Sequence, residues 1–229
     1  MNAIKSNIHS LLDQSSNLLK NEKIPSSRLD AEVLLAYVLG VDRTWLAAHH
    51  DTILQSTTLQ QYEQLVKRRA KHEPVAYIIG KKEFYGREFM VTPSVLIPRP
   101  ETEDVISLAL SIGTERIRPK QCMDKTADTK PQQILDIGCG SGCIGITLKL
   151  ERPEWDVTLV DISQKALAVA KRNAQELGAK TPCIQSDLLS SFIPRALSFS
   201  MIVANLPYVA RAWQRSPETD HEPALALFA

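Results

Sequence analysis

The sequence lacks a strong excess of charge of either sign, and it lacks long apolar runs. Its 229 residues carry 27 basic and 26 acidic side chains, so no strong field draws the chain toward nucleic acid or an anionic membrane. No apolar run approaches the roughly 18 residues that indicate a membrane span. We therefore expect a soluble protein, with no membrane contact and no direct binding of nucleic acid, whose partner is a protein or a small molecule.

Cysteine is scarce and irregularly spaced. The four cysteines, Cys122, Cys139, Cys143 and Cys183, lack the paired Cys-x-x-Cys spacing of a zinc site, and nothing at the N-terminus resembles a cleavable secretion leader. We expect reduced thiols, no bound metal and a cytoplasmic location. Cys139 and Cys143 are interpreted as small buried residues, because no basic residue stands beside them to make either thiol reactive.

The N-terminal part of the chain shows helical periodicity. The 44% hydrophobic content can supply a real core. In "SSRLDAEVLLAYVLG" (26–40), two serines can cap a helix that Gly40 should end. A further helix is predicted over "TLQQYEQLVKRRAKH" (58–72), closed by Pro74. Spacing predicts that the buried faces of these two helices consist of Leu29, Val33, Leu34, Tyr37 and Val38 in the first and of Leu59, Tyr62, Leu65 and Val66 in the second.

Residues 1–75 are therefore predicted to form a small helical bundle that recognises a partner. The basic stretch "KRRAK" (67–71) could contact an acidic partner or favour the helix dipole, and we favour the dipole. In 76–98, beta-branched and aromatic residues punctuated by glycine and proline indicate a β-hairpin linker. A helix should begin at Pro100, and the polar residues 113–133 should form a long surface loop.

From residue 134 onward, short apolar runs alternate with helical segments. This alternation predicts an α/β domain, 99–229, with parallel strands and crossover helices on both faces of the sheet. The loop "LDIGCGSGC" follows one strand and opens a helix, and its glycines let the backbone turn tightly beside a ligand. The next strand ends at Asp161, 19 residues after Gly142, where a carboxylate can accept both hydroxyl protons of a ribose.

Three kinds of nucleoside ligand are compatible with a glycine turn and a carboxylate. A nicotinamide dinucleotide expects G-x-G-x-x-G, but Cys143 occupies the last glycine position, and the Lys-Ser/Thr pair of a phosphate-binding P-loop is missing. S-adenosylmethionine has no phosphates and fits better. Asp187 could accept the adenine amino group while Leu188 covers the ring, although Asp187 could also be a helix or turn cap.

The stretch "VANLPYVA" (203–210) places an asparagine, a proline and a tyrosine where an apolar strand ends. Together with "DIGCGSG", Asp161 and Asp187, this turn resembles the class I S-adenosylmethionine-dependent methyltransferases, with a Rossmann-like fold. The stretch "VAYIIGKKEFYGREFMVTPSVLIPRPETE" resembles, more narrowly, the HemK/PrmC-like glutamine N5-methyltransferases of peptide-chain release factors. The resemblance covers nearly the whole chain, including "EPALAL" near residue 225.

The resemblance implies methylation of the glutamine side chain in the Gly-Gly-Gln motif of class I peptide-chain release factors, in support of translation termination. It also implies a catalytic and substrate-binding turn of Asn205, Leu206, Pro207 and Tyr208. Asn205 and the Leu206 carbonyl would accept the two amide hydrogens of the substrate, and Tyr208 would pack beside it. The cofactor-binding residues are expected to be Asp136, Gly138, Cys139, Gly140, Ser141, Gly142, Asp161, Ile162, Asp187, Leu188 and Asn205.

Two features depart from the family's pattern. The family usually shows Asn-Pro-Pro-Tyr, whereas "NLPY" with Leu206 resembles the turn of RNA adenine dimethylases, so a nucleic-acid adenine methyltransferase is an alternative. The chain also ends 25 residues after Ala204, with fewer strands than the family's sheet. We therefore expect a monomer whose methyltransferase domain is incomplete at its C-terminus, with an inactive binding module as a second alternative.

Overall fold

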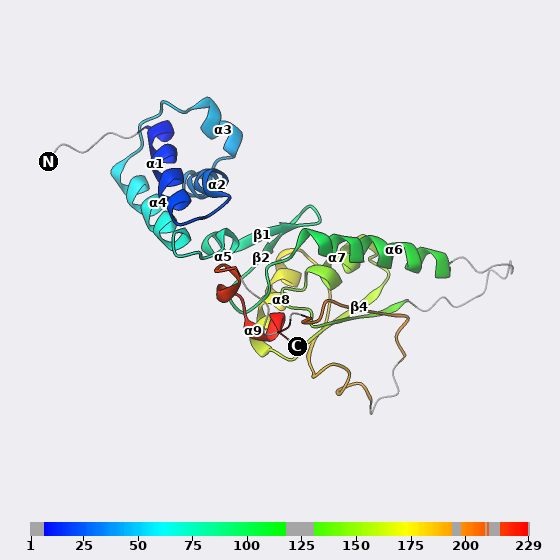
Figure 1. Ribbon diagram of the computed structural model, residues 1–229. Helices are drawn as coiled ribbons and strands as arrows, with labels where there is room; N and C mark the ends of the chain where they lie inside the picture. Colours follow the sequence, from blue (N-terminus) through cyan, green and yellow to red (C-terminus); the bar gives the residue numbers. More distant parts are fainter. Residues whose placement is uncertain (1–6, 118–130, 194–197, 209, 211–215, 229) are drawn as a thin grey trace. The chain divides into compact units, whose positions relative to one another are not determined.

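The computed structural model describes residues 7–117, 131–193, 198–208, 210 and 216–228 (Figure 1). The chain divides into two compact units. The first consists of Met1–Gly80 and Ser216–His221, and the second of Lys81–Arg215 and Glu222–Ala229. Within the described residues, no helix is both long and apolar enough to cross a bilayer. Cys122 lies outside the described residues, and the other three cysteines are free thiols.

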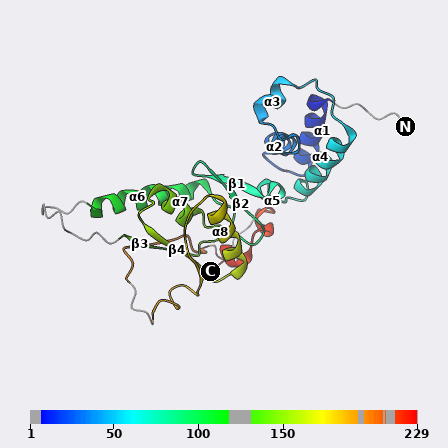
Figure 2. The same cartoon turned by 180° about the vertical axis from the view of Figure 1, so that it is seen from behind.

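The first unit is a helical bundle, in which α1, α2 and α4 pack against one another (Figure 2). Its core is apolar and includes Leu34, Leu35 and Tyr62, all fully buried. The elements described in this unit are α1 (Ile8–Asn21), α2 (Ser27–Leu39), α3 (Arg43–Ala48), α4 (Ser56–Arg69), α5 (Val75–Ile79) and the 3₁₀ turn η3 (Thr219–His221).

The predicted end of α2 is confirmed, and part of its predicted buried face is wrong. Gly40 ends the helix with φ +67°, a left-handed conformation that glycine adopts without steric cost. Leu29 and Tyr37 are nearly half exposed, at 45% and 48%, while Asp30 is buried. The helix turns Asp30 inward because a buried cation on α4 binds it, an interaction that apolar spacing cannot reveal.

That cation is Arg69, at the end of the basic stretch 67–71. Its side chain is 2% exposed and pairs with Asp30 at 2.7 Å and with Glu218. Its neighbour Arg68 binds Glu73 at 2.5 Å. Both arginines lie in the last turn of α4, where cations favour the helix dipole as the sequence indicated. Their ion pairs within the first unit are an additional role that the sequence did not predict. The segment 216–221 belongs to this unit, and His221 Nε2 also lies 3.1 Å from the Lys71 carbonyl oxygen.

The second unit begins with the hairpin of β1 (Lys81–Phe84) and β2 (Arg87–Met90), which pair antiparallel. Tyr85 and Gly86 between them both have positive φ, 51° and 71°, which is the geometry of a two-residue type I′ turn. The contacts group this hairpin with the second unit, whereas the sequence suggested a separate linker over 76–98. Residues 76–79, expected within that linker, belong to helix α5 (Val75–Ile79).

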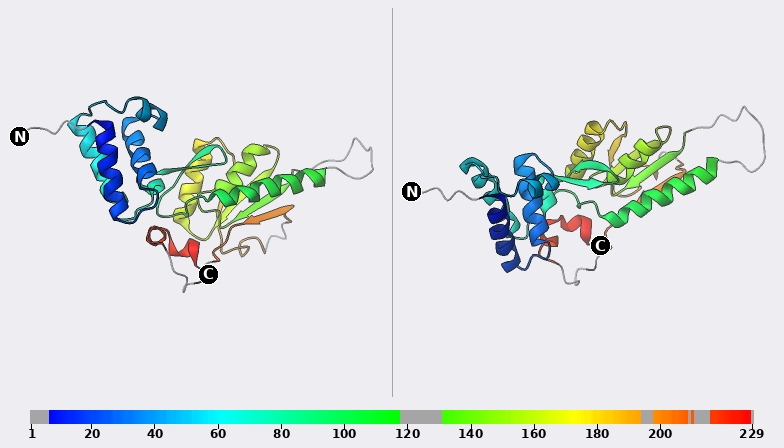
Figure 3. Two further views of the ribbon diagram at one scale, coloured as in Figure 1. Left: turned by 45° about the horizontal axis from the view of Figure 1, so that its top comes forward. Right: turned by 90° about the horizontal axis from the view of Figure 1, so that it is seen from above.

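The sheet of the second unit is parallel, as predicted, with strand order β5-β4-β3-β6. Strand β6, at one edge of this sheet, is the orange arrow in Figure 3. The prediction of an α/β, Rossmann-like domain is confirmed. Its elements are η1 (Pro100–Thr102), α6 (Glu103–Ile117), β3 (Gln133–Ile137), α7 (Cys143–Glu151), β4 (Asp156–Asp161), α8 (Gln164–Glu176), β5 (Cys183–Gln185), β6 (Met201–Ala204) and α9 (Ala224–Leu227). Helix α6 extends to residue 117, so the start of the loop predicted over 113–133 is helical.

Helices α6, α7 and α8 form one layer, since α7 contacts both of its neighbours and packs on β3 and β4. The expectation of helices on both faces was wrong for the described residues. On the other face, Leu135 and Val160 of the sheet pack with Phe192 and Phe199, which come from the connection between β5 and β6. The two phenyl rings meet edge to face at 5.4 Å, so aromatic side chains cover this face.

Candidate active site

The glycine loop lies between β3 and α7, at the carboxyl end of the parallel sheet. Gly138, Gly140 and Gly142 all have positive φ, at 69°, 54° and 80°. Gly142 has a second constraint, because a Cβ there would lie 2.7 Å from Cδ1 of Ile146. The loop therefore turns sharply, as the sequence predicted, and residues 138–141 line a cavity.

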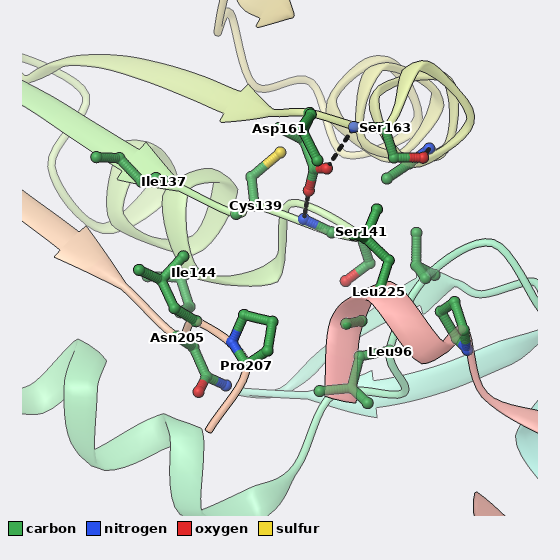
Figure 4. A pocket seen from close by; sticks show the side chains of 18 of the residues that line it. Leu96, Ile137, Cys139, Ser141, Ile144, Asp161, Ser163, Asn205, Pro207 and Leu225 are labelled. Carbon is green, nitrogen blue, oxygen red and sulfur yellow. Dashed lines mark hydrogen bonds between the residues drawn. The ribbon is translucent and has the colours of Figure 1, made fainter. Parts of the chain in front are cut away.

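Asp161 ends β4 directly beside this loop. Its Oδ2 accepts a hydrogen bond from the Gly140 amide at 2.9 Å, and its Oδ1 accepts one from the Ser163 amide at 2.8 Å (Figure 4). These two bonds fix the plane of the carboxylate. Each carboxylate oxygen can accept a second hydrogen bond, so Asp161 can still receive a pair of hydroxyl protons from a ligand.

A cavity of about 260 Å³ opens between the loop, the ends of β4, β5 and β6, and the segment 95–99. Apolar side chains such as Ile144 and Leu225 form much of its wall (Figure 4). Of the residues predicted from the sequence, those that line this cavity are Gly138, Cys139, Gly140, Ser141, Asp161, Ile162, Asp187, Leu188, Asn205, Leu206 and Pro207.

Three predicted site residues do not line the cavity. Gly142 is the N-cap of α7 and faces Ile146 and Ala170. Tyr208 is 82% exposed to solvent. Asp136 is 1% exposed and its Oδ2 accepts from the Gly145 amide at 2.8 Å, while no described residue binds its Oδ1. Burial, assisted by the nearby charge of Asp161, raises the pKa of Asp136 to about 7, with the Gly145 hydrogen bond opposing the shift.

Asn205 follows β6 and lines the cavity opposite Asp161 (Figure 4). Its Nδ2 donates a hydrogen bond to Oγ1 of Thr102 at 3.4 Å. Among the described residues no donor binds its Oδ1, so this oxygen is the end of the amide that can accept a hydrogen bond from a substrate. Leu206, next along the chain, closes over the loop with Cδ2 only 3.0 Å from where a Cβ on Gly138 would stand.

Asp187 and Leu188 follow β5 at the same edge. Leu188 has φ +48° and is 51% exposed, a costly conformation for a branched residue that is often found where a ligand binds. Within the described part of the chain, no hydrogen bond caps a helix or turn with the Asp187 carboxylate. Asp187 lines the cavity at this edge. Burial raises the pKa of Cys139 and raises that of Cys143 to about 12, so both thiols remain protonated and unreactive.

Comparison with known proteins identifies the family. Residues 10–80 match the PrmC N-terminal domain, and residues 120–220 match the methyltransferase small domain. A release factor glutamine methyltransferase of Leptospira interrogans is 41% identical over 227 residues, which cover 96% of this chain and 75% of that protein. Another, of Koribacter versatilis, is 41% identical over 94% of this chain and 73% of its own length. The chain belongs to the release factor glutamine methyltransferase family.

A third relative, the release factor glutamine methyltransferase of Bacillus subtilis, is 42% identical over 79% of this chain and 59% of its own length. The predicted family is thus confirmed. The chain is an S-adenosylmethionine-dependent methyltransferase, and S-adenosylmethionine is its cofactor. The cavity fits this molecule, because the fixed carboxylate of Asp161 retains acceptor capacity for a ribose and the glycine loop leaves room beside its backbone.

Sequence reasoning missed several residues that build this site. Asn173 of α8 is 1% exposed, and its amide binds both the Ser141 carbonyl, at 2.9 Å, and the backbone of Met90. Gly145 lets α7 approach the sheet, since a Cβ there would lie 2.2 Å from Leu159. Thr102 lies in "IPRPETE" and Glu222 lies in "EPALAL". Both stretches resemble the family, but the spacing of residues in the sequence did not indicate a role for either side chain.

Proposed function

We propose that this chain transfers the methyl group of S-adenosylmethionine to the side-chain amide nitrogen, N5, of the glutamine in the Gly-Gly-Gln motif of class I peptide-chain release factors. The observation that carries the proposal is the position of Asn205. It stands at the end of β6, in the same cavity as the glycine loop and Asp161, with its Oδ1 free of any described donor.

The chemical difficulty is that an amide nitrogen is a poor nucleophile, because its lone pair is delocalised into the carbonyl group. S-adenosylmethionine supplies an electrophilic methyl group on a sulfonium. In the proposal, Oδ1 of Asn205 and the Leu206 carbonyl accept the two amide hydrogens of the glutamine. These acceptors orient the nitrogen and stabilise the positive charge that develops on it. The proton is then lost to water, so no strong base is needed.

Pro207 and the cavity wall support this arrangement. A residue that precedes proline is restricted to extended geometry, which fixes the direction of the Leu206 carbonyl. The apolar residues of the wall, Ile144 and Leu225 among them, exclude water from the reacting groups and so strengthen the hydrogen bonds of the two acceptors. Tyr208, being exposed, is proposed to cover the glutamine side chain only when the substrate is bound.

The other site assignments belong to the same proposal. The backbone of residues 138–141 would border the cofactor while Gly142 shapes the turn, Asp161 would bind the ribose, and Asp187 would bind the adenine amino group under cover of Ile162 and Leu188. Asp136 would support the loop from below. The first unit would contact the release factor, and the enzyme would act as a monomer in the cytoplasm, where translation terminates.

Mass spectrometry of a release factor after incubation with the enzyme and S-adenosylmethionine tests the proposal. We expect a gain of one methyl group on the Gly-Gly-Gln glutamine, and none on a matched factor with glutamate at that position. Asn205→Ala should reduce methyl transfer by about two orders of magnitude, the usual loss when one positioned hydrogen-bonding group is removed, while cofactor affinity is retained. Methylation of RNA adenine in place of the glutamine would overturn the proposal.

A further inference from the structure

The ion pair of Arg99 and Glu222 stands beside the cofactor cavity and has no role in the function described so far. Glu222 has a side chain that is only 2% exposed, and it accepts hydrogen bonds from the Ile97 amide at 3.2 Å and from Nη2 of Arg99 at 2.5 Å. Arg99 is 45% exposed and lines the cavity. Glu222 therefore holds one nitrogen of the guanidinium from the buried side, while the rest of the group stays accessible.

The charges around the cavity are complementary to the cofactor. The described side chains that line it include the two carboxylates Asp161 and Asp187 and a single basic group, Arg99. S-adenosylmethionine carries one negative group, the carboxylate of its amino-acid end. Guanidinium binds carboxylates through two parallel N–H bonds, and Arg99 keeps donors for this purpose after pairing with Glu222.

The order of the strands places Arg99 at the correct end of the ligand. In the sheet order β5-β4-β3-β6, Asp187 follows β5, Asp161 follows β4 and Asn205 follows β6. A ligand with its adenine at Asp187 and its ribose at Asp161 therefore extends its amino-acid end past the glycine loop, toward β6. Thr102, three residues after Arg99, is hydrogen-bonded to Asn205, so the segment that carries Arg99 lies on this side.

We infer that Arg99, positioned by Glu222, binds the carboxylate of the amino-acid end of S-adenosylmethionine. The pair then selects an intact amino-acid end over adenosyl thioethers that lack one. This inference rests on the cofactor and is independent of the identity of the methyl acceptor.

Calorimetric titration of the purified chain with two ligands tests the inference. S-adenosylhomocysteine has the carboxylate, and 5′-methylthioadenosine has the same adenosine and thioether without it. Arg99→Met should weaken S-adenosylhomocysteine about 10- to 150-fold, the effect of losing a charge-assisted pair of hydrogen bonds, and should change the affinity for methylthioadenosine by less than about 3-fold. Arg99→Lys keeps the positive charge but cannot donate two parallel hydrogen bonds to one carboxylate. It should weaken S-adenosylhomocysteine less than Arg99→Met does, and it should also leave the affinity for methylthioadenosine nearly unchanged.

Two further variants separate recognition from damage to the fold. Glu222→Gln retains an acceptor for the Ile97 amide but loosens Arg99, so it should weaken S-adenosylhomocysteine selectively and by less than Arg99→Met. Arg172→Met removes an exposed arginine of α8 that pairs only with Glu176 among the described residues, and it should leave both affinities unchanged. Equal weakening of both ligands in Arg99→Met and Arg99→Lys, or no weakening of S-adenosylhomocysteine, would overturn the inference. A wild-type chain that binds S-adenosylhomocysteine but methylates no release factor would refute only the proposed acceptor.

Discussion

Replacing Asn173 by alanine should destabilise the second unit and loosen the glycine loop. The Asn173 amide joins three parts of the chain, because it stands on α8, donates to the Ser141 carbonyl in the loop at 2.9 Å, and binds β2 twice. On β2 it accepts from the Met90 amide at 2.7 Å and donates to the Met90 carbonyl at 3.0 Å. Alanine would remove all three hydrogen bonds and leave their backbone partners without a side-chain amide.

The expected loss follows from counting these bonds. Each neutral hydrogen bond contributes about 0.5 to 1.5 kcal/mol net, so three contribute about 2 to 4 kcal/mol to the free energy of unfolding. For a domain of this size, 1 kcal/mol corresponds to about 3 °C in Tm, which gives a decrease of about 6 to 12 °C. Affinity for S-adenosylhomocysteine should also fall, by roughly 3- to 10-fold, since the Ser141 carbonyl loses the group that orients it.

Thermal unfolding followed by circular dichroism, with and without S-adenosylhomocysteine, measures both effects. Asn173→Asp sharpens the test, because aspartate keeps an acceptor for the Met90 amide but cannot donate to either carbonyl, and it should be at least as unstable as the alanine variant. Arg172→Ala, the adjacent exposed position on α8, is the matched control and should change Tm by less than about 2 °C. A decrease of that small size in Asn173→Ala would refute the reasoning.

Three other perturbations follow from the geometry of the site. Asp161→Ala should weaken S-adenosylhomocysteine by about 2 to 4 kcal/mol through loss of two charge-assisted hydrogen bonds, and unchanged affinity in a calorimetric titration would count against the ribose assignment. Thr102→Val should lower kcat about 2- to 12-fold by releasing Nδ2 of Asn205. Thr102→Ser, which keeps the hydroxyl, should restore kcat. When Asn205 is already alanine, adding Thr102→Val should lower kcat no further. Asp136 has its folded-state pKa raised to about 7, above the ordinary value of about 3.9, so its stabilising contribution is full below about pH 4 and is lost as the pH rises through 7. Denaturation of Asp136→Asn between pH 4 and 8 should therefore show a weaker decline of stability with pH than the wild type, and parallel profiles would exclude Asp136 as the source.

The elements that the sequence predicted correctly are those specified by neighbouring residues. Gly40 ends α2 because only a residue tolerant of positive φ closes that helix without strain. The glycine loop and Asp161 were predicted because a strand, a tight turn and a helix follow one another in the chain, and the next strand ends beside them in a parallel sheet. In each case, residues close together in the chain were sufficient to predict the local structure.

The elements that the sequence did not reveal depend on partners far along the chain. "VAYII" has the composition of a strand but forms α5, since Tyr77 and Ile78 are buried in the helical geometry. Asn173 has its partner at Met90, 83 residues away, and Glu222 has its partner at Ile97, 125 residues away. No periodicity or motif spacing reports such pairs, so the support of the glycine loop and the wall of the cavity required the structure.

The return of residues 216–221 to the first unit means that this unit is not encoded by one continuous stretch of the gene. A fragment cut after Gly80 would keep Arg69 and Asp30 but lose Glu218, and the guanidinium, 2% exposed, would lack one of its two anionic partners. Recombination that exchanges the first 80 codons between relatives must therefore also exchange the codons for 216–221, or preserve an acidic residue at 218. The two segments should accordingly change together during evolution, although 135 residues separate them along the chain.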